Sequence, residues 1–164
     1  MTTKPGSTGA GLTELLVSAA LVGVIAAISA PTFHSYVQGS ALKAGAEELA
    51  ALMNLARSVA IKENTRVCVK RDPGGTNRVQ LLIGGTNPCA ATSFYGAQGR
   101  GFDARVDAAG WIALQNGVAV SAATADVVFT ALGIAVPGGT YTVRKGGQTL
   151  SVVAAPTGRV TIAP

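Results

Sequence analysis

The most unusual chemical group in this sequence is the carboxylate of Glu14, because it lies inside an apolar run. Residues 12–30 read LTELLVSAALVGVIAAISA, nineteen residues in which Glu14 is the sole charged side chain. An α-helix needs about 20 such residues to cross a bilayer. A carboxylate inside a membrane costs about 2.5–3.5 kcal/mol on insertion scales, so we expect Glu14 to have a function and a cationic partner.

The apolar run itself cannot supply that partner, because it contains no Lys, Arg or His. Lys4 lies ten residues before Glu14, in a segment rich in Gly, Ser, Thr and Pro. The nearest positive group would therefore be a new amine, created by cutting the chain just before the run.

Residues 9–17, GAGLTELLV, resemble the type III signal of type IV pilins and pseudopilins: a Gly before the cut, a Glu five residues after it, then an apolar helix. The resemblance implies that a prepilin peptidase cleaves after Gly9 on the cytoplasmic side and methylates the new amine of Ala10. Glu14 would then pair with that amine on a neighbouring subunit, and Pro31 falls where pilin helices commonly kink. Pilins usually have Phe and Thr after the cut, whereas this sequence has Ala10 and Gly11.

Two other readings of the N-terminal segment remain. A cleaved secretory signal would use Lys4 as its positive region, but Glu14, the length of the apolar run and Pro31 all weigh against it. An ordinary membrane anchor with a stray Glu is the second. We therefore expect a leader at residues 1–9, a helix at residues 10–64 and a membrane span at about residues 12–31.

The second half of the expected helix has the period of an amphipathic helix. Its apolar residues recur three, four or seven apart. We expect it to end near Glu63, because Asn64 tolerates the left-handed conformation found at helix ends. Glu47, Glu48 and Lys62 are expected to form a solvated face. The apolar positions are Leu42, Ala46, Leu49, Met53, Ala56 and Ala60.

Residues 65–164 predict a β-rich head, so the fold class is α+β with a pilin-like long helix packed on antiparallel strands. Residues 66–71 and 78–83 flank the turn sequence DPGGTN and predict a hairpin. Residues 88–110 are expected to form an irregular surface loop. Further strands are expected at residues 111–114, 117–120, 127–130, 141–144, 150–153 and 160–162.

Cys68 and Cys89 are the only cysteines, and outside the cytoplasm they are expected to form a disulfide. A metal site is not expected, because two cysteines and the single His34 cannot supply four convergent ligands. We find no cofactor motif and no convergent set of catalytic side chains, so we expect a protein that is not an enzyme and binds no cofactor. With 48% hydrophobic and 13% charged residues, the chain is too apolar to be disordered.

Several short segments of the head are similar to the GspH/FimT family, which contains pseudopilin H of type II secretion and minor pilins of type IV pili. They are Ala56 to Ile61, Val67 to Val69, Asn87 to Cys89, Trp111, Val128 to Thr130 with Gly133, and Thr157 to Val160. The resemblance implies a structural subunit that primes assembly of a type IV pilus or sits at its tip. It also implies binding to other pilins through the N-terminal helix, and a single-pass position in the bacterial inner membrane with the head in the periplasm. The alternative within the family is pseudopilin H.

The head is also basic, with nine Lys and Arg against four Asp and Glu from Thr65 onward. Some FimT-like pilins are implicated in DNA uptake through a C-terminal Gly-Arg-x-Arg element, and this sequence has Gly-Arg-Val-Thr at residues 158–161. If Arg144 and Lys145 lie near Arg159, three cations could bind DNA weakly and without sequence preference. DNA capture is therefore a third hypothesis, beside Arg159 as a charge on an edge strand.

Overall fold

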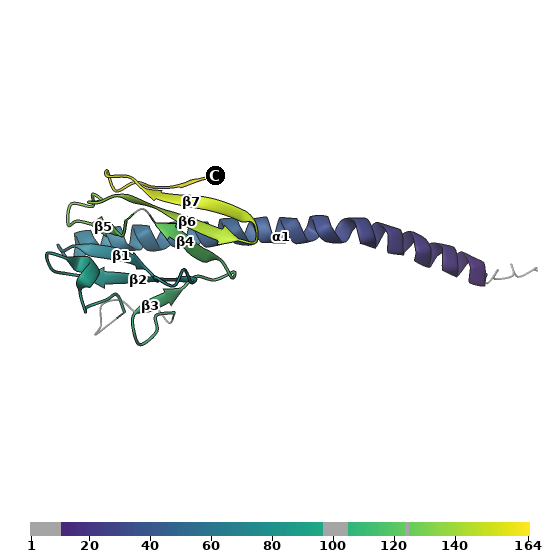
Figure 1. Ribbon diagram of the computed structural model, residues 1–164, viewed down its shortest axis with the longest axis horizontal. Coiled ribbons are helices and arrows are strands. Elements are labelled where there is room, and N and C mark those ends of the chain that lie inside the picture. Colours follow the sequence, from purple (N-terminus) through teal and green to yellow (C-terminus); the bar gives the residue numbers. More distant parts are fainter. Residues whose placement is uncertain (1–10, 97–104, 124) are drawn as a thin grey trace, which may run out of the picture. The chain divides into compact units, whose positions relative to one another are not determined.

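The computed structural model describes residues 11–96, 105–123 and 125–164, with the side chains of residues 30–32, 122 and 123 left aside. The predicted long helix, α1, spans Leu12–Lys62 (Figure 1). The chain divides at Val37, and Gln38–Pro164 form a compact head. Among the described residues, α1 is the one helix long and apolar enough to cross a membrane.

The helix ends as the sequence predicts. Asn64 adopts a left-handed conformation with φ 49°, and the amide of Thr65 donates to the carbonyl of Ala60 over 3.0 Å. This hydrogen bond satisfies one of the last carbonyls of the helix, which have no donor within the helix itself. The β-branched residues Thr65 and Val67 follow, and the chain enters its first strand.

The head contains two four-stranded sheets (Figure 1). All strand pairs are antiparallel, as the sequence predicts, and β1 and β2 form the expected hairpin around residues 72–77. In spatial order, the first sheet contains β3 (Trp111–Ala113), β2 (Arg78–Ile83), β1 (Val67–Arg71) and β5 (Val127–Phe129). The second contains β4 (Ala119–Ala123), β6 (Gly139–Lys145), β7 (Gln148–Ala154) and β8 (Val160–Ala163).

Three strands differ from the prediction at ends that are set by turn geometry. A strand was expected at residues 117–120, but β4 starts at Ala119, because Asn116 and Gly117 have φ of 63° and 60° and form a turn. The strands expected at 141–144 and 150–153 are longer, since only Gly146 and Gly147 separate β6 from β7. A two-residue hairpin of this kind needs positive φ, which Gly146 adopts at 58°.

The segment expected to be irregular, residues 88–110, contains a short 3-10 helix, η1, at Pro88–Ala90. Isolated bridges join Phe94 to Leu82 and Val106 to Ile112. Residues 97–104 lie outside the described part of the chain. The described remainder is held to the first sheet by these bridges rather than by regular strands.

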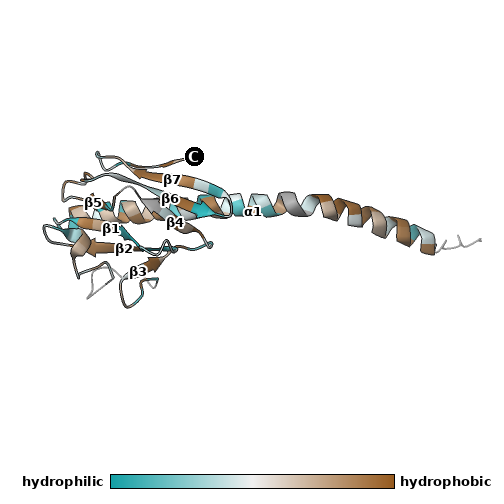
Figure 2. Ribbon diagram, viewed as in Figure 1, coloured by the Kyte–Doolittle hydropathy of each residue, from teal (hydrophilic) through white to brown (hydrophobic). Residues whose placement is uncertain are grey.

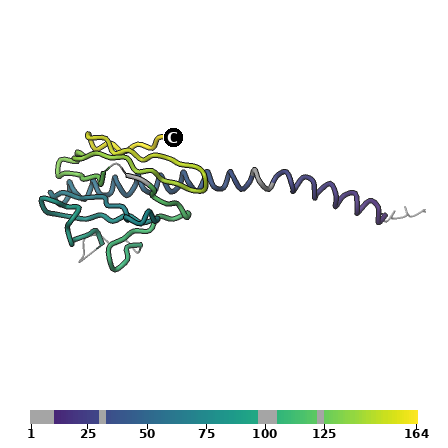
Figure 3. Tube along the Cα trace, in the orientation of Figure 1, coloured from purple at the N-terminus to yellow at the C-terminus, as the bar shows by residue number. Residues whose placement is uncertain are grey.

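The head's core forms where α1 meets the two sheets (Figure 3). The six helix positions predicted from the periodicity are all buried. Gly45 allows close approach, because a Cβ there would lie 2.5 Å from a methyl carbon of Val118. The strands contribute, among others, Val67, Phe129 and Tyr141.

The expected solvated face of the helix is only partly correct. Glu47 is exposed, but the side chain of Glu48 is just 15% exposed. Its carboxylate accepts hydrogen bonds from Arg105 Nη1 at 2.5 Å and from the amide of Gln115 at 2.8 Å. Glu48 therefore ties the helix to the segments on either side of β3.

Candidate functional site

The N-terminal part of α1 presents apolar side chains on every side. All described side chains from residue 11 to residue 29 are exposed, and Figure 2 shows this stretch as predominantly hydrophobic. A helix that is apolar all round is normally buried, either in lipid or against other protein. The geometry therefore suits insertion into a membrane or a bundle of helices.

Glu14 lies in the first turn of this helix, where a negative charge is favoured by the helix dipole. Its amide donates to the carbonyl of Gly11 over 2.9 Å, and its own carbonyl accepts from Ser18 Oγ at 2.7 Å. No cation lies within 4 Å of its carboxylate among the described residues. Gly9 and Ala10, the expected cleavage and methylation positions, lie outside the described residues, so the pairing of Glu14 with the Ala10 amine stays a prediction.

The helix continues through position 31, where the residue is proline and so has no backbone N–H to donate to the carbonyl of Ala27. Phe33 and Tyr36 follow within two turns, and both are exposed. Aromatic side chains are enriched where a membrane span meets water. The end of the span near residue 31 stays a prediction.

The predicted disulfide between Cys68 and Cys89 is confirmed, with the two Cα atoms 5.1 Å apart. It joins β1 to η1 and packs in a small cluster with Leu82 and Val128. A carboxylate oxygen of Asp126 lies within 4.8 Å of both sulfur atoms, but sulfurs in a disulfide are not thiolate ligands. The bond thus anchors the irregular segment to the first sheet.

Asp72, in the β1–β2 hairpin, has an unusually stable charge. Its carboxylate accepts from Thr76 Oγ1 and from Arg78, each over 2.7 Å, and from the amide of Gly74 over 3.1 Å. The Thr76 hydrogen bond, followed by that of Arg78, lowers the pKa of Asp72 from 3.8 to about 2. The guanidinium of Arg78 also stacks over Trp111 of β3, 5.6 Å from the ring centre. These contacts hold the hairpin turn to the sheet.

The three basic residues considered for DNA binding are not brought together. Arg144 and Lys145 lie at the β6–β7 hairpin, where a Cβ on Gly146 would meet Gln38 Oε1 of α1 at 2.5 Å. The residue before Arg159, Gly158, instead lies against Arg57 of α1. Gln38 and Arg57 are separated by about 28 Å along the helix axis. The condition for a three-cation site, that these residues lie close together, is therefore not met.

Three segments that are distant in sequence meet at the end of the head where α1 stops. They are the last turns of α1, the loop at residues 130–137 and the turn at residues 155–159. The amide of Ala135 donates to the carbonyl of Pro156 over 3.1 Å, which joins the loop to the turn. Gly133 and Gly158 permit the contact, since a Cβ on Gly158 would lie 1.9 Å from the carbonyl oxygen of Gly133.

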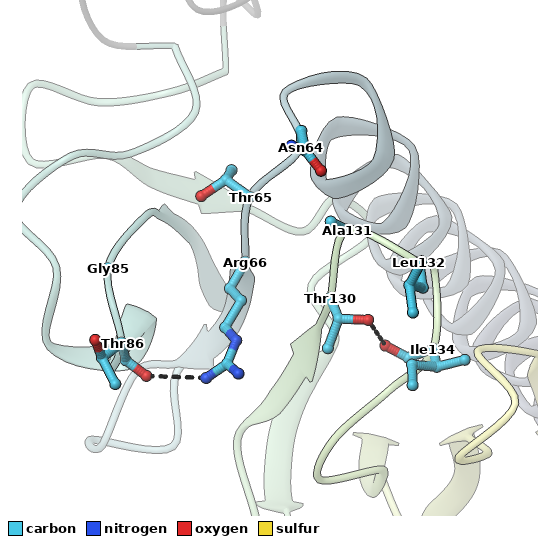
Figure 4. A pocket seen from close by; sticks show the side chains of 9 residues that line it. All are labelled: Asn64, Thr65, Arg66, Gly85, Thr86, Thr130, Ala131, Leu132 and Ile134. Carbon is cyan, nitrogen blue, oxygen red and sulfur yellow. Dashed lines mark hydrogen bonds between the residues drawn. The ribbon is translucent and has the colours of Figure 1, made fainter.

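A cavity of about 620 Å³ opens at this end of the head. Figure 4 shows the residues that line it. On one side Arg66 Nη1 donates to the carbonyl of Thr86 over 3.2 Å. On the other lie Thr130, Leu132 and Ile134 (Figure 4). This cavity was not predicted from the sequence. Leu132 and Ile134 flank the turn residue Gly133, but single exposed apolar residues are common and do not by themselves indicate a site.

The model of the family described as type II transport protein GspH matches residues 45–158. The chain therefore belongs to the GspH family. The match takes in the second half of α1 and nearly all of the head, and it confirms the family resemblance drawn from the sequence motifs.

Solved structures resemble this GspH-family chain in fold. A crystal structure of the type IV minor pilin FimU from Pseudomonas aeruginosa strain PAO1 has a TM-score of 0.52 at 19% identity, covering 79% of this chain and 92% of FimU. A second crystal form of FimU gives a TM-score of 0.48, also at 19% identity, covering 74% and 92%. No curated protein sequence matches the chain significantly. The pilin-like fold class, one long helix on antiparallel sheets, is confirmed.

Proposed function

We propose that this GspH-family chain is a minor pilin of a type IV pilus, a structural subunit without catalytic activity that primes assembly or sits at the filament tip. The observation that carries the proposal is the stretch of α1 from residue 12 to residue 29, which is exposed throughout, in a chain whose head belongs to the GspH family. Such a surface requires lipid before assembly and other helices after it. The partners are accordingly other pilins, which bind through this helix.

Maturation follows from the same segment. Prepilin peptidase cleaves after Gly9 and methylates Ala10 while the chain spans the inner membrane, with the head in the periplasm. Glu14 then pairs with the Ala10 amine of a neighbouring subunit, which offsets the cost of a carboxylate in an apolar medium. Mass spectrometry of the protein from cells with active peptidase should find Ala10 as the first residue. A mature chain that still begins at Met1 would contradict this maturation.

The Glu14 pairing has a separate test. Glu14→Gln keeps the size of the side chain but removes its charge, so we expect cleavage to continue and incorporation into filaments to fall at least tenfold. The matched control is Ser18→Ala, one turn along the same helix, which should leave incorporation unchanged. Equal incorporation of the Gln variant and the parent would remove Glu14 from the assembly mechanism.

The second candidate is pseudopilin H of a type II secretion system, which the description of the matching family favours. A clean deletion strain and its complemented parent distinguish the two. Loss of surface pili in electron micrographs supports the minor pilin. Normal pili with secreted proteins retained in the periplasm support the pseudopilin instead.

A further inference from the structure

Exposed apolar side chains of the head gather at one place. In the described part of Gln38–Pro164, five large apolar residues are exposed, and four of them lie where α1 ends. These are Ile61 (50% exposed), Leu132 (83%), Ile134 (39%) and Val136 (56%), here called the distal surface. The fifth, Ile162, belongs to β8. Apolar residues concentrated in this way mark an interaction site more often than residues scattered singly.

The distal surface is built by the backbone. Ala135 is buried and bridges to Phe129 of β5, so its neighbours Ile134 and Val136 face away from the core. The loop is held against the helix, because a Cβ on Gly133 would lie 2.8 Å from Ile61 Cδ1. Leu132 and Ile134 also line the cavity that Figure 4 shows. Two of the four side chains thus line the cavity, and the loop that carries Leu132, Ile134 and Val136 is held against α1 at Ile61.

Arg57 lies beside this surface with its hydrogen-bonding capacity unused. Its Nε is buried without an acceptor, between Gly133 and Gly158, and a Cβ on either glycine would approach that atom to 3.1 Å. The two terminal nitrogens form no hydrogen bond or ion pair with the described residues. Among the buried side-chain nitrogen and oxygen atoms of the described residues, only Arg57 Nε has no hydrogen-bond partner. The terminal nitrogens, which also have no partner, are therefore not buried and reach solvent. A half-buried guanidinium without a carboxylate is an incomplete arrangement.

Two arginines of the head have carboxylate partners, in contrast to Arg57. Arg78 pairs with Asp72 at 2.7 Å and Arg105 pairs with Glu48 at 2.5 Å, whereas Arg66, at the cavity, donates only to a backbone carbonyl. The distal surface therefore combines apolar side chains with two guanidinium groups, from Arg57 and Arg66, that have no carboxylate among the described residues. A complementary ligand is apolar and carries a carboxylate.

We propose that the distal surface binds an apolar segment bearing an Asp or Glu side chain on a different subunit of the filament. This inference rests on the proposed function and names the partner of a surface distinct from the N-terminal helix. A second copy of this chain fits less well. A symmetric contact would oppose arginines to arginines, and the described head offers no second cluster of exposed apolar residues to accept the first.

The test places a photo-reactive benzophenone amino acid at Leu132 of the full-length chain, in cells that assemble filaments. Adducts in purified filaments are detected by immunoblot, and the linked peptide is identified by mass spectrometry. We expect a peptide from another pilin-class subunit with an acidic residue among apolar ones. Arg57→Glu should lower the adduct yield at least tenfold, and reversing the partner's acidic residue to Lys should restore it.

Two further variants keep the result interpretable. Arg57 is partly buried, so Arg57→Glu could lower the yield by impairing folding. Ile61→Glu changes an exposed side chain of the same surface and should lower the adduct yield as well. Ile162→Glu is the matched control, because it places the same charge at the exposed apolar residue outside the surface.

An adduct with a second copy, with lipid or with nucleic acid would overturn the proposal, as would filaments that contain the chain without any adduct. A chain absent from all filaments would refute the proposed function itself, and this inference with it.

Discussion

The hydroxyl of Tyr141 joins the two sheets of the head, and we expect its removal to destabilise the head by about 2 kcal/mol. Tyr141, in β6 of the second sheet, is fully buried. Its hydroxyl donates to the carbonyl of Val69 in β1 and accepts from the amide of Val127 in β5 over 3.1 Å. Both partners belong to the first sheet.

The magnitude follows from what Tyr141→Phe leaves behind. Phenylalanine fills nearly the same space, so no large cavity forms, but the buried amide of Val127 loses its acceptor. A buried donor without an acceptor costs about 1–3 kcal/mol. For a head of about 130 residues, whose unfolding entropy is about 0.27 kcal/mol/K, a loss of 2 kcal/mol lowers Tm by about 7 °C.

The assay is urea and thermal unfolding of residues 38–164, which contain the whole described core. Tyr95→Phe, a half-buried tyrosine of the same head, is the matched control and should change Tm by less than about 2 °C. An unchanged Tm in Tyr141→Phe would refute the inference that this hydroxyl holds the sheets together. A changed urea m-value would instead indicate an altered native or denatured state.

The same hydroxyl makes stability depend on pH. Burial raises the pKa of Tyr141 well above its usual 10, and this effect outweighs the hydrogen bond from the Val127 amide, which lowers it. Because the folded pKa exceeds the unfolded one, this contribution is complete below pH 10 and is lost as the pH rises further. Alkaline destabilisation should therefore be weaker in Tyr141→Phe than in the parent, measured by urea titrations at pH 9 and above.

Three further predictions follow from the head. Replacing Cys68 and Cys89 together by Ala opens a loop of about twenty residues and should cost about 3 kcal/mol in urea unfolding, and a loss below about 1 kcal/mol would contradict the chain-entropy argument. Because the pKa of Asp72 is about 2 when folded and 3.8 otherwise, its contribution is complete above about pH 4 and disappears toward pH 2. Asp72→Asn should therefore flatten the acid side of the stability profile, and an unchanged acid slope would show that other carboxylates dominate. DNA capture by the head has its own measurement: a gel shift with residues 40–164 that is absent at low salt, or indifferent to Arg159→Ala, would remove the hypothesis.

Local features of this fold were predictable because they depend on neighbouring residues. The helix end follows from Asn64, the first hairpin follows from its turn sequence, and the buried helix positions follow from their period. The disulfide could be predicted because only one pairing of Cys68 and Cys89 exists within the chain.

The division into two sheets was not predictable from the sequence. The strand β5 pairs with β1, which is some sixty residues away, rather than with its sequence neighbour β4. Strand order depends on which faces pack against the helix, and a propensity pattern does not contain that information. Glu48 was misread for the same reason, since its partners Arg105 and Gln115 are more than fifty residues distant.

The distal surface was missed for a different reason. Leu132, Ile134 and Val136 are unremarkable in sequence, because single exposed apolar residues are common in any protein. Arg57 was noted only within a family-like segment. These residues form one surface only because Ile61 and Gly158 lie beside them. The fold brings them together by packing two separate turns onto the end of α1.

The continuity of α1 has a mechanical consequence. Leu42, Leu49 and Met53 of this helix are central to the head's core, so the head has no hydrophobic interior independent of the helix. Tension applied to α1 where it enters the head, at Gln38, would act directly on these side chains. Resistance to such a load is governed by the rate of forced unfolding. A subunit built this way would release its anchor under tension only by opening its core.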